Sequence, residues 1–158
     1  MSQNRPLASP LRALASTLLL AAFLSAPAMA QNDMSRGTYL AKVTGCEGCH
    51  SAHDAAGNVL PGRLMAGGDH PIRAGGGPGI VPPNITPDRE TGIGGWDVPA
   101  IMAAIRTGQT PDGGVLSVAM PWRTQFAALT EADARAIAVY LLTVQPIHRT
   151  GGESDVAH

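Results

Sequence analysis

Both cysteines of this 158-residue chain lie in one short stretch, GCEGCHSAHDAAG. Two residues separate Cys46 from Cys49, and His50 follows directly. Two thiols and an imidazole within five residues support three chemistries: a redox-active cysteine pair, a metal site, and the covalent attachment of haem. Because each of them requires a different surrounding fold, this stretch limits the possible architecture more than any other part of the sequence.

The start of the chain has the pattern of an export signal. Two arginines precede an apolar run over about residues 13–24, and Ala28-Met29-Ala30 matches the small-x-small site that a signal peptidase cleaves. The sequence therefore predicts a signal peptide over residues 1–30, with cleavage after Ala30 and a location in the periplasm. The apolar run is too short to span a bilayer comfortably, and we expect no transmembrane helix in the mature chain.

The predicted mature chain carries little positive charge. Lys42 is its one lysine, and no basic stripe is present. Nucleic acid is therefore not expected as a partner.

The first predicted helix covers residues 35–44, directly before the cysteines. Ser35 is a residue type that caps helix N-termini, and a glycine ends the segment. Tyr39, Leu40 and Val43 are expected to form its apolar face.

Two more helices are predicted in the second half of the chain. One covers residues 98–107, between an N-capping Asp97 and a terminating Gly108. The other begins after Thr130, an N-cap residue, and ends before Pro146.

Most of the remaining sequence is predicted to be irregular. The region 60–96 is too rich in glycine and proline for regular structure. A loop of that length inside a small domain is usually functional or disordered. We therefore expect one all-α domain over residues 31–149, with about three main helices and long loops, followed by a flexible tail over 150–158.

The three chemistries of the cysteine stretch place different demands on the surrounding sequence. A thioredoxin-like pair needs a strand before the first cysteine, whereas a helix is predicted before Cys46. Zinc needs a fourth ligand, and His53 and His70 are not paired at zinc-finger spacing. The order C-x-x-C-H is the attachment signature of c-type haem, and export supports it. The favoured prediction is one haem c per chain, bound covalently by Cys46 and Cys49, with His50 as proximal iron ligand.

A sixth ligand for the iron has several candidates. Methionine is common in electron-transfer cytochromes because its soft thioether favours the reduced iron. Met120 is best placed, on a loop shortly before the last helix, and the following proline stiffens that loop. Met65 is a rival, Met102 is expected to pack in the core, and a histidine or an open site remains as an alternative.

Four segments resemble the class I cytochrome c domain, and more closely the cytochrome c subunits of periplasmic dehydrogenases that use quinone or molybdenum cofactors. They are RGTYLAKVTGCEGCHS, PNITPDRETGIGGW, IRTGQTPDGGVLSVAMPW and LTEADARAIAVYLLTVQP. The loop PNITPDRETGIGGW is the segment most specific to the dehydrogenase-linked group. Many members of that group carry further haem domains or a C-terminal membrane helix, whereas this chain has a single C-x-x-C-H motif.

The resemblance implies an all-α domain wrapped around one haem and ligated by His50 and Met120. It implies that the first and last helices cross at Gly37 and Tyr140, and that the loop at 84–85 packs on the haem. The implied function is a periplasmic electron carrier, not an enzyme by itself, with a periplasmic dehydrogenase as donor and an oxidase or another cytochrome as acceptor. The alternatives are a haem sensor or small haem enzyme with an open sixth site, and, more distantly, a zinc or dithiol protein.

Overall fold

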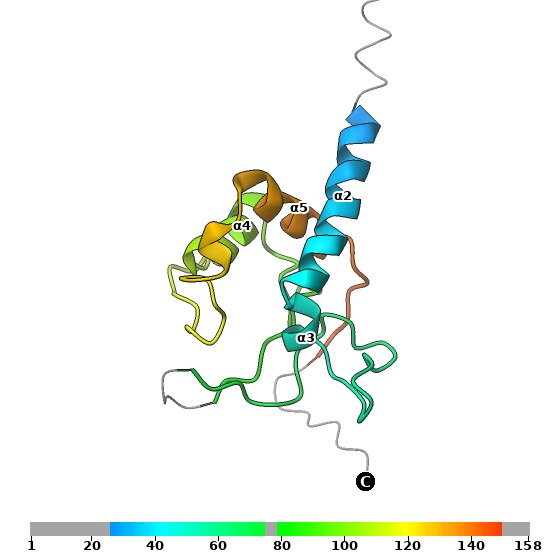
Figure 1. Ribbon diagram of the computed structural model, residues 1–158, viewed down its shortest axis with the longest axis vertical. Coiled ribbons are helices and arrows are strands. Elements are labelled where there is room, and N and C mark those ends of the chain that lie inside the picture. The colour runs from blue at the N-terminus through cyan, green and yellow to red at the C-terminus, as the bar shows by residue number, and fades with distance from the viewer. Residues whose placement is uncertain (1–25, 75–78, 150–158) are drawn as a thin grey trace, which may run out of the picture. The chain divides into compact units, whose positions relative to one another are not determined.

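The computed structural model describes residues 26–74 and 79–149 (Figure 1). The chain divides into two compact units, residues 1–32 and 33–158. The elements in chain order are α2 (Ala26–Val43), α3 (Cys46–His50), α4 (Val98–Thr107), the 3-10 helix η1 (Phe126–Ala128) and α5 (Glu131–Leu141). Between residues 26 and 149, with 75–78 set aside, there are isolated β-bridges but no strands. The predicted all-α class is confirmed.

Two predicted segments fall outside the described residues. These are the tail over 150–158 and most of the signal peptide, residues 1–25. The predicted cleavage point after Ala30 lies within α2. None of the described helices is both long enough and apolar enough to cross a bilayer.

The first predicted helix, residues 35–44, was wrong in its start and in most of its buried face. It begins at Ala26, so Ser35 lies inside the helix and is not its N-cap. No glycine interrupts residues 26–34, and Pro27 falls in the first turn, where a helix tolerates proline. The buried residues are Gly37, Leu40 and Ala41, which share one face at helical spacing.

The expected apolar face of this helix was wrong for two of its three residues. Tyr39 is 59% exposed and Val43 is 58% exposed. The small residues at 37 and 41 let α2 approach its neighbour closely, and that packing decides which face is buried.

Helices α4 and α5 confirm their predicted caps. The Asp97 carboxylate accepts a hydrogen bond from the Ala100 N–H at 2.9 Å, and Gly108 ends α4 with a left-handed φ of 75°. The Thr130 hydroxyl accepts a hydrogen bond from the Asp133 N–H at 3.1 Å. Each cap satisfies a backbone donor that the helix itself leaves unpaired.

The crossing of α2 and α5 confirms the contact that the resemblance implied. A Cβ placed on Gly37 would lie 2.0 Å from the Ala136 carbonyl oxygen and 2.7 Å from the Tyr140 Cβ. Only glycine leaves room for this approach. Beside the crossing, the Arg36 guanidinium lies 2.9 Å from the Asp133 carboxylate.

The long region between α3 and α4 is irregular wherever it is described, as predicted. It folds back on itself around buried polar groups and a buried methionine. The Met65 N–H donates to the Ser51 hydroxyl at 3.0 Å, and the Met65 carbonyl accepts from the Ile85 N–H at 2.9 Å. The region therefore contributes to the core although it lacks helices.

Candidate functional site

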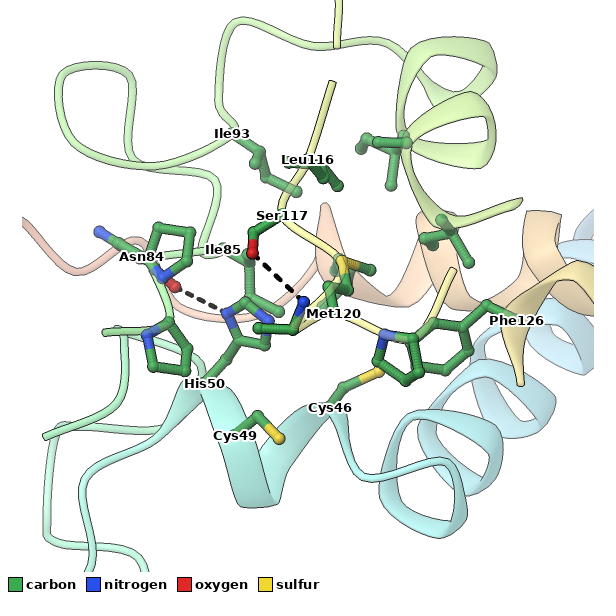
Figure 2. A pocket seen from close by; sticks show the side chains of 18 of the residues that line it. Cys46, Cys49, His50, Asn84, Ile85, Ile93, Leu116, Ser117, Met120 and Phe126 are labelled. Carbon is green, nitrogen blue, oxygen red and sulfur yellow. Dashed lines mark hydrogen bonds between the residues drawn. The ribbon is translucent and has the colours of Figure 1, made fainter. Parts of the chain in front are cut away.

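One large cavity lies in the middle of the second unit, with a volume of about 650 Å³. That volume falls within the roughly 300–1,000 Å³ of typical cofactor sites. Helices α3, α4 and α5 and the loops around 80–96 and 110–126 all contribute to its wall. The lining side chains are mostly apolar and include Ile101. Figure 2 labels four more of them, Ile85, Ile93, Leu116 and Phe126.

Helix α3 brings the two cysteines and the histidine to this cavity. Gly45 adopts a left-handed φ of 86° between α2 and α3, and this reversal starts the new helical turn. Cys46 and Cys49 are three residues apart on that turn, so both thiols face the cavity. Figure 2 shows them along one side of it, with His50. Both cysteines are free thiols, and burial raises the pKa of Cys46.

His50 is held in one orientation by a backbone carbonyl. Its Nδ1 lies 2.8 Å from the Pro83 carbonyl oxygen. Because a carbonyl can only accept, Nδ1 carries the proton and Nε2 keeps its lone pair. Burial lowers the pKa of His50, and this effect is larger than the rise that the Pro83 hydrogen bond causes. The ring is therefore a neutral imidazole whose Nε2 can ligate a metal, the arrangement that a metal-binding histidine usually has.

Met120 reaches the same cavity from the loop that precedes η1. Its N–H donates to the Ser117 carbonyl at 3.1 Å, and its own carbonyl accepts from the Trp122 N–H at 2.8 Å. Figure 2 shows Met120 and His50 as parts of one cavity wall although they come from distant segments.

Trp122 ties the segment around Met120 to the rest of the fold, although no role was predicted for it from the sequence. The Trp122 indole N–H donates to the Leu116 carbonyl at 3.1 Å. A Cβ on Gly108 would lie 2.5 Å from the Trp122 ring, so the ring packs directly on the end of α4. A tryptophan two residues after the candidate methionine was the available signal in the sequence.

The other candidate methionines lie elsewhere. Met65 is completely buried in the core and does not line the cavity. Met102 packs against the core, as expected, and Met34 is 45% exposed. Of Met34, Met65, Met102 and Met120, only Met120 lines the cavity.

The competing chemistries find less support in the described residues. A helix, α2, precedes Cys46 where a thioredoxin-like pair would need a strand. Within residues 26–74 and 79–149, no three histidine, cysteine or acidic side chains are grouped so that they could hold a metal ion. His70 instead contacts the neighbouring Asp69 carboxylate at 2.6 Å.

The residues present fit a haem. The cavity is large and apolar, as a porphyrin requires, and two free thiols lie at one side of it. A neutral imidazole nitrogen and a thioether sulfur, both known axial ligands of haem iron, complete the donor set. An all-α domain with a C-x-x-C-H turn on an apolar cavity is the architecture of a cytochrome c domain.

Comparison with known proteins supports that class. No protein-family model matches the chain. It is 33% identical over 125 residues to the "Diheme cytochrome c-type" protein of Cereibacter sphaeroides. The matched residues cover 79% of this chain and 40% of that protein. It is 33% identical over 127 residues to the "Gluconate 2-dehydrogenase cytochrome c subunit" of Pantoea cypripedii, covering 78% of this chain and 26% of the relative.

A third relative is the "Alcohol dehydrogenase (quinone), cytochrome c subunit" of Gluconobacter oxydans. It is 34% identical over 128 residues, which cover 78% of this chain and 24% of the relative. The chain thus spans less than half the length of each of these three relatives. It is a homologue of the cytochrome c subunits of dehydrogenases, and the resemblance predicted from the sequence is confirmed.

Proposed function

We propose that this chain is a periplasmic c-type cytochrome with one haem that carries single electrons from a dehydrogenase to a respiratory acceptor. The main support for this proposal is that the single C-x-x-C-H turn and Met120 line the same apolar cavity. When bound, haem supplies a reversible one-electron Fe(III)/Fe(II) couple.

The chain's own residues would hold the group from three directions. The Cys46 and Cys49 thiols would each add across a vinyl group, with sulfur bonding to one carbon and the thiol proton passing to the other. His50 would ligate the iron through Nε2, and Met120 through its sulfur. The soft thioether would favour the reduced iron, and the apolar wall would keep water away from it.

The proposed electron donor follows from the relatives. Two of the three relatives named above are cytochrome c subunits of a gluconate and an alcohol dehydrogenase, so a dehydrogenase is the proposed electron donor. An oxidase or another cytochrome is the proposed acceptor. The predicted signal peptide over residues 1–30 would deliver a mature domain over 31–149 to the periplasm.

The test is the absorption spectrum of protein matured in a bacterial periplasm, compared with Met120→Ala. A low-spin c-type spectrum with a methionine-to-Fe(III) charge-transfer band is expected, and Met120→Ala should lose that band. Met65→Leu is the matched control, because Met65 is buried outside the cavity, and it should keep the band.

Two results would contradict the proposal. A high-spin spectrum in the native protein would favour an open sixth site and hence a haem sensor or small haem enzyme. A band that survives in Met120→Ala and disappears in Met65→Leu would remove Met120 as the ligand.

A further inference from the structure

The hydrogen bond that orients His50 depends on the position of the Pro83 carbonyl. Pro83 has no N–H, so its peptide nitrogen donates no hydrogen bond that could fix the loop. Its position therefore depends on its two neighbours. On one side, the Pro82 carbonyl accepts from the Gly68 N–H at 3.0 Å. On the other side lies Asn84 (Figure 2).

Asn84 uses its whole side chain in hydrogen bonds. The amide is buried, with 7% of the residue exposed. Its Oδ1 accepts from the Thr86 N–H at 2.9 Å and from the Thr86 hydroxyl at 2.8 Å. Its Nδ2 donates to the Ile147 carbonyl at 2.7 Å and to the Thr91 hydroxyl at 2.9 Å. A buried amide with both donors and its acceptor engaged is rigid, because moving it breaks several bonds at once.

These bonds join the Pro83 loop to the segment after α5. The Ile147 N–H donates back to the Thr86 hydroxyl at 3.1 Å, and the Arg149 N–H donates to the Thr91 hydroxyl at 2.9 Å. Thr86 is completely buried. The post-α5 segment therefore anchors Asn84, and Asn84 fixes the residue whose carbonyl holds His50.

We propose that Asn84 is a positioning residue for His50, and that it sets the strength of the hydrogen bond from His50 Nδ1 to the Pro83 carbonyl. This inference rests on the proposed role of His50 as iron ligand. A strong hydrogen bond at Nδ1 makes Nε2 a more basic ligand and so favours Fe(III). Loosening the Pro83 loop weakens that bond and shifts the redox equilibrium toward Fe(II).

The test uses the haem-loaded protein with two variants that loosen the anchor. Asn84→Ala removes all four side-chain bonds, and Thr86→Val removes the hydroxyl that links Asn84 to Ile147. The first readout is the hydrogen-exchange rate of the His50 Nδ1 proton, followed by NMR in the reduced protein. The second is the reduction potential.

The matched variants are Asn58→Ala and Thr86→Ser. Asn58 is an exposed asparagine whose side chain bonds to Asp54, away from the Pro83 loop. Serine at position 86 keeps the hydroxyl. Both should retain the native exchange rate and potential.

We expect Asn84→Ala to speed Nδ1 proton exchange about tenfold or more and to raise the reduction potential, as loss of an outer-shell partner typically weakens metal ligation 10- to 100-fold. A tenfold shift of a one-electron equilibrium corresponds to about 59 mV. Thr86→Val should produce smaller changes of the same sign.

Variants that lose stability but keep native proton exchange and potential would overturn the inference and leave Asn84 a purely structural residue. Equal changes in Asn58→Ala would also overturn it. A wild-type protein without a histidine–methionine haem spectrum would instead overturn the proposed function, and this inference with it.

Discussion

Replacing Gly37 by alanine tests whether the close crossing of α2 and α5 holds this domain together. The added Cβ would lie 2.0 Å from the Ala136 carbonyl oxygen. A carbon–oxygen contact of this kind usually measures about 3.3 Å or more, so the helices would have to separate by about 1 Å. The obstacle is backbone, which no rotamer change can move aside.

The magnitude follows from two opposing effects. Alanine is favoured over glycine inside a helix by about 0.5–1 kcal/mol. Overpacking a well-packed contact costs about 1–3 kcal/mol, and a gap of about 1 Å forfeits up to half of each remaining dispersion contact. We therefore expect Gly37→Ala to lower the free energy of unfolding by about 2 kcal/mol.

The assay is guanidinium chloride unfolding of the haem-loaded protein, with Gly95→Ala as the matched control. A Cβ at Gly95 would meet nothing within 4 Å, and its backbone conformation suits alanine. The control should unfold at or slightly above the wild-type midpoint. A Gly37→Ala protein as stable as wild type would refute the crossing as described.

Three further predictions concern the loop, the acid range and the surface. Gly108→Ala should lower the free energy of unfolding by more than about 1 kcal/mol and weaken the methionine charge-transfer band. The reasons are that φ is 75° at this position and that the Trp122 ring leaves no room for a Cβ. A variant with both native stability and a native spectrum would contradict this. The pKa of Asp133 is lowered by the Thr130 hydroxyl first and by Arg36 second, so its stabilising effect is present above its ordinary pKa and lost as the pH falls through the lowered one. Asp133→Asn should therefore flatten the fall of stability with acid, measured by unfolding between about pH 5 and pH 2. Finally, Ile80 and Val115 are exposed, apolar and on the cavity wall, so electron exchange with a partner should depend little on ionic strength; a steep loss of rate with added salt would contradict an uncharged docking surface.

Local features of this fold were predictable because their interactions lie within one helical turn. The caps at Asp97 and Thr130 are bonds between residues three apart, and the stop at Gly108 needs only one left-handed residue. The α2 helix was predicted less well. Its start had no strong signal, and its buried face depends on how closely α5 can approach.

For the candidate site, the C-x-x-C-H order, together with a predicted helix before it and an export signal, predicted haem c. The structure then showed that Cys46, Cys49 and His50 lie on one short helix. Composition alone also predicted an irregular, glycine-rich middle region. Other questions needed the packed chain. Met65 and Met120 were both loop methionines in the sequence, and only tertiary packing buried the first in the core and left the second on the cavity wall. The bond from His50 to Pro83 spans 33 residues, and the Asn84 anchor spans 63. Such contacts leave no local pattern, since they exist only after the intervening chain has folded into one particular arrangement.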